Sequence, residues 1–186
     1  MNTIGRNDYR FTTDRLQLEP LTAADLPVLH GLLTDPSVRQ YLCDDQVIPV
    51  SEAANILETA LDTFAKGGYG LWLVYPKGQL EAVGFVGLYG FFSELQPQLL
   101  YALRPQYQGQ GFATEASRRI VQYAFDALGY AYLEASCDVP NVASVRVMER
   151  LGMERLKEER VDDKALVWYR LNREGYRAAP REGLAN

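Results

Sequence analysis

The 186-residue sequence predicts a single α/β domain with a mixed, mostly antiparallel sheet of about seven strands and helices on both faces. An early pair of strand-like segments around a tight turn indicates a β-hairpin. Later a strand, a helix and another strand follow one another, which is typical of a β-α-β crossover. Because the chain has no repeat and no interdomain linker, we expect one domain at 1–174, its core within about 12–172, and a polar tail at 175–186.

The first half of the sequence alternates between strand and helix signals. The expected elements are a strand at 14–20, a helix after Thr22 that Asp35-Pro36 stops, a helix after Ser51 that Gly67-Gly68 ends, and a hairpin at 69–92 that turns at Pro76–Gln79. Leu16 and Leu18 alternate with polar neighbours, as in a half-buried strand. Thr22 is followed three residues later by Asp25, a spacing typical of a helix N-terminus.

The second half contains the crossover and two closing strands. The expected elements are a strand at 98–105, a helix from the glycine turn to Gly129, a strand at 130–138, a helix at 140–152 capped by Asn141 and ended by Gly152, and strands at 153–161 and 165–172. Alanine, isoleucine and phenylalanine residues between 113 and 128 recur at helical spacing, which predicts one buried face.

Composition excludes several classes of function. A formal net charge of −5 disfavours general nucleic-acid binding and attachment to a membrane through a polybasic patch. Cys43, Cys137 and the single histidine, His30, have no familiar zinc spacing, so we expect no metal and two free thiols. Residues 1–15 lack the apolar core of a signal peptide, and no apolar run approaches transmembrane length. We therefore expect a cytoplasmic protein.

A glycine pair lies where the strand at 98–105 gives way to a helix, in the stretch QYQGQGFATEA at 106–116. Such turns bind phosphate, because main-chain N–H groups and the helix dipole converge there. A P-loop would need a lysine where Phe112 stands. A dinucleotide fingerprint would need a third glycine where Thr114 stands, although Asp138 lies about where a ribose-binding acid belongs. These departures exclude a P-loop and weaken the dinucleotide alternative, while N–H groups from about Gln108 to Thr114 are the unpaired donors of a helix start and can hold a diphosphate without a lysine.

The pattern Gln106-x-x-Gly109-x-Gly111 resembles the acyl-CoA pyrophosphate motif of the GNAT acetyltransferases. The stretches 13–42, 107–116 and 141–153 also resemble, in order and spacing, the branch of that family that contains ribosomal-protein N-terminal acetyltransferases. The resemblance implies a GNAT fold with a splayed strand pair at the acyl-CoA site, acetyl-CoA as co-substrate and N-acetyltransferase activity. The implied acceptor is a protein N-terminus or a small amine, and a homodimer is possible. The alternative is a non-catalytic acyl-CoA-binding or sensor module of the same fold.

The resemblance also implies roles for particular residues. The expected acyl-CoA-binding residues are Tyr101, Ala102, Leu103, Gln108, Gly109, Gln110, Gly111, Phe112, Ala113, Thr114, Asn141 and Ser144. A main-chain N–H within 101–103 would stabilise the oxyanion, and the pantetheine arm would pair with this strand. Asn141 would bind pantetheine amides, and Ser144 would reach the sulfur directly or through water. Many family members carry a tyrosine as general acid one turn further on, where this chain has Met148.

The general base and the acceptor pocket are less well defined. Gln98 stands near a position where the resembled branch often has a glutamate, so Glu94 or a chain of waters is the candidate base. A free α-amine, with a pKa near 8, is partly neutral at cytosolic pH and needs no strong base. The further candidates are Tyr89, Phe91 and Phe92 for the acceptor pocket, Arg118, Arg119 and Arg146 for the 3′-phosphate of coenzyme A, and His30 and Glu115 for structural or surface roles.

Overall fold

The computed structural model of the protein describes residues 9–91, 96–161 and 163–178. The described strands form two sheets, and every ladder in them is antiparallel. The first sheet contains β1 (Phe11–Thr12), β2 (Leu16–Pro20), β3 (Leu71–Pro76), β4 (Gly84–Tyr89) and β5 (Gln98–Leu103) in that order. The second contains β6 (Tyr132–Asp138), β8 (Lys164–Asn172) and β7 (Glu154–Val161) in the order β6-β8-β7. The predicted α/β fold class is confirmed.

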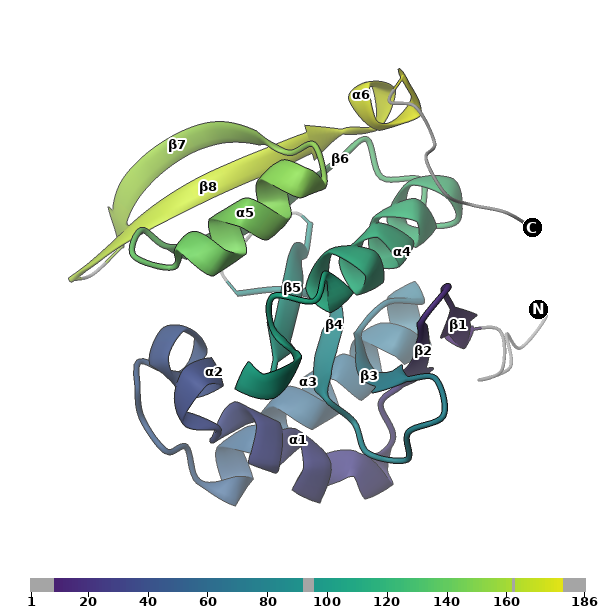
Figure 1. Cartoon of the computed structure of the whole chain (residues 1–186), viewed down its shortest axis with the longest axis vertical. Helices are drawn as coiled ribbons and strands as arrows, with labels where there is room; N and C mark the ends of the chain where they lie inside the picture. Colours follow the sequence, from purple (N-terminus) through teal and green to yellow (C-terminus); the bar gives the residue numbers. More distant parts are fainter. Residues whose placement is uncertain (1–8, 92–95, 162, 179–186) are drawn as a thin grey trace.

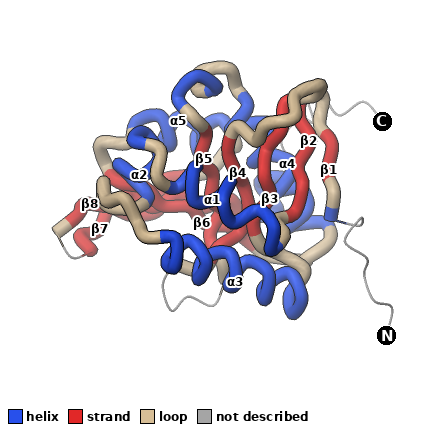
Figure 2. The backbone as a smooth tube through the Cα atoms, turned by 90° about the horizontal axis from the view of Figure 1, so that it is seen from below, coloured by secondary structure: helices blue, strands red, loops and turns tan. Residues whose placement is uncertain are grey.

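Helices cover both faces of the five-stranded sheet (Figure 1 and Figure 2). The helices are α1 (Leu26–Leu33), α2 (Pro36–Leu42), α3 (Val50–Gly67), α4 (Phe112–Asp126), α5 (Val142–Arg150) and α6 (Arg173–Ala178). Along β3, Leu71 and Leu73 pack into one core cluster with α1 and α3, and Trp72 and Val74 pack into another with α4. This strand reads as a continuous apolar run because both of its faces are buried.

The two sheets face each other along β5 and β6. No ladder joins these two strands, although they run close together and α4 connects them in sequence. The Ser136 hydroxyl on β6 donates a hydrogen bond to Gln98 Oε1 on β5 at 2.8 Å. Beyond this hydrogen bond β5 and β6 diverge, and this divergence is the splayed strand pair that was expected.

Several predicted boundaries are confirmed by their hydrogen bonds. Thr22 and Asp25 form a capping box ahead of α1, in which the Thr22 N–H donates to Asp25 Oδ2 at 2.7 Å. Asn141 caps α5 by accepting a hydrogen bond from the Ser144 N–H at 3.1 Å. The turn at Pro76–Gln79 is present, with the Gln79 N–H donating to the Pro76 carbonyl at 3.0 Å.

The structure corrects two predicted helix boundaries. Asp35-Pro36 does end the first helix region, but it also begins α2, which the sequence analysis missed. Asp35 caps α2 by accepting from the Ser37 N–H at 3.0 Å, and a proline fits the first helical turn because its missing N–H would have no partner there. Ser51 does not cap α3, which begins at Val50 with Pro49 at the capping position.

The chain also differs from prediction near its end. Residues 173–178 form α6, where the sequence predicts a loose polar tail from residue 175. The ring of Tyr176 packs against Phe125 of α4 at a centroid distance of 5.2 Å. This ring contact and the Arg173 N–H, which donates to the Ala131 carbonyl at 2.9 Å, tie α6 to the core, and residues 179–186 lie outside the described part of the chain. No helix within the described residues has both the length and the apolar character needed to cross a bilayer.

Candidate active site between the two sheets

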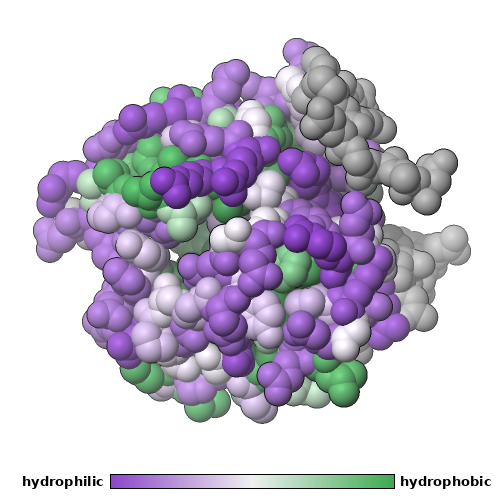
Figure 3. Space-filling view, in the orientation of Figure 1, coloured by the Kyte–Doolittle hydropathy of each residue, from purple (hydrophilic) through white to green (hydrophobic). Residues whose placement is uncertain are grey.

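A cavity of about 540 Å³ opens where β5 and β6 diverge, bounded by the N-terminal turn of α4, by α5 and by α2. Figure 3 shows the molecule hollowed at this place, between α5 and α2. All of the predicted acyl-CoA-binding residues line this cavity except Gln110. The fold therefore gathers segments that are distant in the sequence, from Ser37 of α2 to Arg150 of α5, around one opening.

The glycine turn adopts the backbone conformation that its sequence requires. Gly109 has φ 72° and Gly111 has φ 81°, both in the left-handed region that other residues rarely occupy. Gly111 is the N-cap of α4, and the Glu115 N–H donates to the Gly111 carbonyl at 3.0 Å. The N–H groups of Phe112, Ala113 and Thr114 precede that bond and belong to the exposed donors of a helix N-terminus.

Thr114 adds a side-chain donor to this helix terminus. The residue is 7% exposed, and its hydroxyl has no hydrogen-bond partner among the residues that the structure describes. A buried hydroxyl without a partner costs roughly 1–3 kcal/mol, and because Thr114 lines the cavity, a ligand bound there would offset that cost by accepting its hydrogen bond. The two glycines, the helix terminus and this hydroxyl together fit an anion such as a diphosphate.

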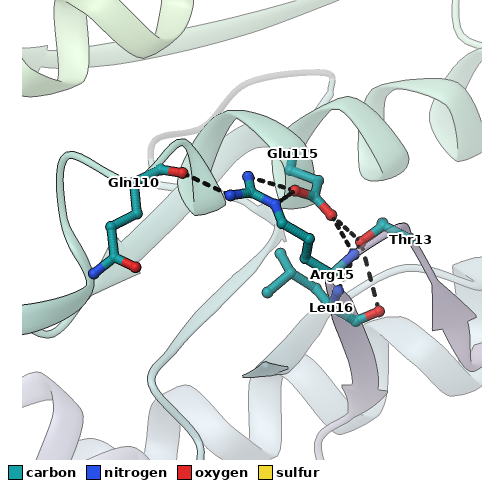
Figure 4. A network of polar contacts seen from close by, with 5 residues as sticks. All are labelled: Thr13, Arg15, Leu16, Gln110 and Glu115. Atoms are coloured by element: carbon teal, nitrogen blue, oxygen red, sulfur yellow. Dashed lines mark hydrogen bonds and ion pairs between the residues drawn. The ribbon is translucent and has the colours of Figure 1, made fainter. Parts of the chain in front are cut away.

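A polar network fixes the glycine turn from outside the cavity (Figure 4). Glu115 accepts hydrogen bonds from the Thr13 hydroxyl at 2.5 Å and from the Arg15 N–H at 2.9 Å, and it pairs with the Arg15 guanidinium at 2.6 Å. Arg15 also donates to the Gln110 main-chain carbonyl at 2.9 Å, and Gln110 does not line the cavity. Burial alone would raise the pKa of Glu115, but the hydrogen bonds and the charge of Arg15 lower it. Glu115 therefore has the structural role that was one of its two expected roles.

The backbone of β5 presents alternate residues to the opening. The Arg104 N–H donates to the Val83 carbonyl at 2.9 Å. Because hydrogen-bonded positions alternate along an antiparallel pair, the main-chain groups of Ala102, two residues earlier, also face β4. The main-chain groups of Tyr101 and Leu103 consequently point away from β4. In agreement with this, the Leu103 carbonyl accepts a hydrogen bond from the Gln108 side chain at 2.9 Å. Within the predicted segment 101–103, the N–H groups of Tyr101 and Leu103 therefore point away from β4, and Tyr101 is the one of these two residues whose side chain reaches the Ser144 hydroxyl.

The side chain of Tyr101 is a site feature that the sequence analysis missed. Its hydroxyl donates to the Ser144 carbonyl at 3.0 Å and lies 2.8 Å from the Ser144 hydroxyl. Burial raises the pKa of Tyr101 strongly, and the hydrogen bond with Ser144 opposes this in part. Strand alternation could have found it, because Tyr101 shares a face with Leu99 and Leu103, which pack toward α4.

Met148 is fully buried in the core and does not line the cavity. The tyrosine that the resembled family carries near this position thus has no counterpart on α5 in this chain. Tyr101, which reaches Ser144 from β5, supplies a phenol at the opening instead. Cys137 also lines the cavity, and burial raises the pKa of its thiol to about 11.

The other candidates separate into residues that line the cavity and residues that do not. Among the three predicted arginines, Arg146 lines it, together with Arg150, which was not predicted. Arg119 packs over the ring of Phe11 at 3.8 Å, and Arg118 donates to the Arg150 carbonyl at 3.5 Å.

The remaining polar candidates have structural partners. Gln98 is 2% exposed and engaged with Ser136, and His30 Nε2 lies 3.0 Å from the Ile48 carbonyl, as expected for a packing role. The candidate base Glu94 and the candidate pocket residue Phe92 lie outside the described residues.

A second cavity of about 370 Å³ adjoins the first, because Leu42 and Leu100 line both. Tyr89 and Phe91, two of the aromatic residues predicted for an acceptor pocket, line this second cavity. The centroids of their rings lie 5.2 Å apart in an edge-to-face arrangement. The predicted aromatic residues within the described part of the chain therefore lie at a pocket next to the glycine-turn cavity.

Comparisons with known proteins agree with this architecture. The family described as "Acetyltransferase (GNAT) domain" matches residues 15–154. The uncharacterized N-acetyltransferase YnaD of Bacillus subtilis (strain 168) is 25% identical over 144 residues, covering 77% of this chain and 82% of its own. The uncharacterized protein YkkB of the same organism is 30% identical over 168 residues, covering 86% and 94%.

A solved structure supports the fold. The ribosomal L7/L12 alpha-N-protein acetyltransferase RimL, in complex with coenzyme A, superposes with a TM-score of 0.71 at 18% identity, covering 88% of this chain and 97% of its own. Because the family match spans most of the chain and its glycine turn, the protein belongs to the GNAT family of acetyltransferases and is an acyltransferase.

Proposed function

We propose that the protein transfers the acetyl group of acetyl-CoA to a primary amine, which attacks the thioester directly through a tetrahedral intermediate. One observation carries this proposal most. A single cavity joins the anion-binding turn at Gly109–Thr114 to the Tyr101–Ser144 hydroxyl pair. One end of this cavity suits a diphosphate and the other suits a departing thiolate.

The glycine turn is the proposed binding site for the diphosphate. Main-chain N–H groups at the start of α4 and the Thr114 hydroxyl would donate to its oxygens, and no lysine is required there. Arg146 and Arg150 line the same cavity from α5 and are the proposed partners of the 3′-phosphate. The network around Glu115 would hold the turn in this conformation before acetyl-CoA arrives.

The pantetheine arm would lie along the free edge of β5, as an added strand does. The N–H of Tyr101 would then donate to the thioester oxygen as negative charge develops on it. Removing a donor of this kind typically costs about 3 kcal/mol of barrier. Asn141 uses Oδ1 to cap α5, so its amide nitrogen remains for a pantetheine carbonyl.

Ser144 is the proposed group that meets the sulfur. When the amine nitrogen bonds to the carbonyl carbon, the carbon–sulfur bond breaks and the thiolate needs a proton or a hydrogen-bond donor. The Ser144 hydroxyl would turn toward the sulfur while Tyr101 donates to Ser144. Burial raises the pKa of the Tyr101 phenol further above neutral pH, so the phenol keeps its proton and can donate it to the Ser144 hydroxyl when it leaves the Ser144 carbonyl.

Thiol release tests this function directly. Purified protein is incubated with acetyl-CoA and a panel of primary amines and peptides, and free thiol is followed with time. The proposal requires acceptor-dependent release that Ser144→Ala reduces while acetyl-CoA affinity, measured by calorimetry, is retained. Saturable binding of acetyl-CoA without release on any acceptor would favour the non-catalytic alternative.

A further inference from the structure

We propose that the second cavity is the acceptor site, and that it takes a small primary amine borne on an apolar body, with Glu52 binding the ammonium group. The inference rests on the proposed function and narrows it to a substrate class. Three features of the cavity carry it: its place beside β5, its apolar walls and the sign of its charges.

The position of the cavity suits the attacking amine. Along β5, Leu100 packs with the cluster formed by α1 and α3, and Tyr101 packs with the cluster that includes α4. The second cavity therefore lies on the face of β5 opposite the Tyr101–Ser144 pair. Since Leu42 and Leu100 line both cavities, an amine held in the second would meet the thioester where the two adjoin.

Most of the side chains that line the cavity are apolar, and Asp44, Gln46 and Glu52 add polar groups to it. Leu71 and Phe85, which are each 1% exposed, line the cavity together with Ile56. The paired rings of Tyr89 and Phe91 also line it. A volume of about 370 Å³ falls in the range of small-molecule sites. Such a site favours an alkyl or aromatic body, because burying apolar surface is favourable and burying an unpaired polar group is costly.

The charges on the cavity are negative. Asp44 and Glu52 are the only charged residues that line it, within the residues that the structure describes. Asp44 is already paired with Lys164 of β8, whereas Glu52 forms no ion pair with any described residue. One available carboxylate at an apolar pocket matches one ammonium group on an apolar body.

This arrangement also favours some classes of amine over others. The second cation of a polyamine would find only Asp44 as a further carboxylate, and Asp44 is already paired with Lys164. The carboxylate of a free amino acid would be repelled by Glu52 and Asp44. A peptide N-terminus carries polar amides next to its amine, and the apolar side chains that make up most of the lining would offer these amides no hydrogen-bond partner.

The ammonium ion binds Glu52 and loses one proton to solvent before it reacts. Its nitrogen then forms a bond to the acetyl carbon, and the carbon–sulfur bond breaks. The second amine proton leaves to solvent, and the thiolate takes a proton through the Ser144 hydroxyl. The products are an N-substituted acetamide and free coenzyme A, so the step needs no further reactant.

Initial rates with a matched panel test the inference: 2-phenylethylamine and hexylamine, spermidine, glycine, and a short peptide with a free N-terminus. We expect kcat/KM for the two apolar amines to exceed the others by about tenfold or more. Glu52→Gln should raise the KM for 2-phenylethylamine by about tenfold, as for loss of a charge-assisted hydrogen bond, and leave kcat and the KM for acetyl-CoA unchanged. Glu58→Gln, an exposed position on the same helix that does not line the cavity, is the matched control.

The outcomes separate the two proposals. Preference for spermidine or for the peptide, or an unchanged KM in Glu52→Gln, would overturn the acceptor class while leaving acetyl transfer intact. If no amine gives thiol release, the proposed function fails. In that case, ligand-observed NMR of 2-phenylethylamine with the full chain still tests whether the second cavity is a binding site for an amine. Binding that Glu52→Gln weakens supports the site, and absence of binding overturns it.

Discussion

The hydroxyl groups of Tyr101 on β5 and Ser144 on α5 lie 2.8 Å apart, across the opening between the two sheets. The Tyr101 hydroxyl also lies 3.0 Å from the Ser144 carbonyl, and a phenol has only one proton to donate. While Tyr101 donates to that carbonyl, Ser144 donates to Tyr101. If the Tyr101 proton turns to the Ser144 oxygen, the Ser144 proton becomes free for a ligand. The pair can therefore exist in two arrangements without any movement of the backbone.

The first prediction concerns this pair. Tyr101→Phe should lower kcat by about tenfold with little change in the KM for acetyl-CoA, because it removes the donor behind Ser144 but no contact to coenzyme A. Ser144→Ala should lower kcat by about a hundredfold, in the range of a lost proton donor. The double variant should lose little more than Ser144→Ala alone, since Tyr101 acts through Ser144.

Steady-state kinetics of the three variants measure this prediction. Tyr132→Phe, on β6 and outside the cavity, is the matched control and should retain full activity. Additive losses in the double variant would mean that Tyr101 and Ser144 act independently.

The second prediction separates binding from stability at Thr114. Thr114→Val removes a buried hydroxyl that has no partner in the described structure, so the free energy of unfolding should stay the same or rise. Affinity for coenzyme A should fall about tenfold, because the diphosphate loses one donor.

Ser117→Ala is the matched control for Thr114→Val. Its hydroxyl is also buried without a described partner, but it lies outside the cavity. Calorimetric titration with coenzyme A should give the same affinity for this variant as for the parent. Equal affinities in all three proteins would remove Thr114 from the binding site.

The sequence predicted the parts of the site that depend on local patterns. Gly109 and Gly111 were identified because a left-handed turn before a helix demands glycine, and Asn141 because a helix start demands a cap. These requirements involve only a few neighbouring residues, so one sequence is enough to reveal them. The same holds for the strand periodicity that gave β5 and β6.

The features that the sequence did not predict depend on contacts between distant segments. Nothing near Tyr101 in the sequence shows that its hydroxyl meets Ser144, because that contact is set by how α5 packs on β5. The helix α2 was missed for a local reason, since a proline was interpreted only as a stop. Its residues line the cavity, so this error also hid one wall of the site.

The third prediction concerns the backbone of the glycine turn. Gly109→Ala should reduce stability by about 1–2 kcal/mol, because a Cβ in the left-handed region is strained even though no atom lies within 4 Å of its position. It should also weaken coenzyme A binding, because the turn would relax away from the conformation that aims its N–H groups. Gly78→Ala has the same open surroundings and φ 82° but lies in the β3–β4 connection. The midpoint temperature of thermal unfolding should fall equally in both variants, whereas coenzyme A affinity should fall only in Gly109→Ala. An equal loss of coenzyme A affinity in Gly78→Ala would contradict the proposed role of the turn.

The fourth prediction uses the pKa of Cys137, which burial raises to about 11. At neutral pH only about one thiol in ten thousand would be ionised, so alkylation by iodoacetamide should be slow and should accelerate as pH rises toward that value. Because Cys137 lines the first cavity, saturating coenzyme A should slow its alkylation further. Peptide mass spectrometry after timed alkylation resolves Cys137 from Cys43. Rapid modification at neutral pH, or no protection by coenzyme A, would contradict this prediction.

The fifth prediction concerns the pH dependence of the network at Glu115. Its pKa is lowered in the folded protein, so the stabilisation it provides is fully present above its ordinary pKa and is lost as pH falls through the folded value. Glu115→Gln should reduce the free energy of unfolding at neutral pH by about 1–3 kcal/mol, as expected for hydrogen bonds to a charged group. The difference between parent and variant should shrink as pH falls below the ordinary pKa of a glutamate, about 4.3, and through the lower pKa of the folded protein.

Glu134→Gln separates this stability effect from binding. The Glu134 side chain is 19% exposed, close to the 18% of Glu115, and pairs with Arg170 away from the cavity. Both variants should lose stability in urea titrations, but only Glu115→Gln should weaken coenzyme A binding, because only Glu115 holds Arg15 against the glycine turn. Unchanged coenzyme A affinity in Glu115→Gln would mean that the turn keeps its conformation without the network, and that the left-handed glycines alone define it.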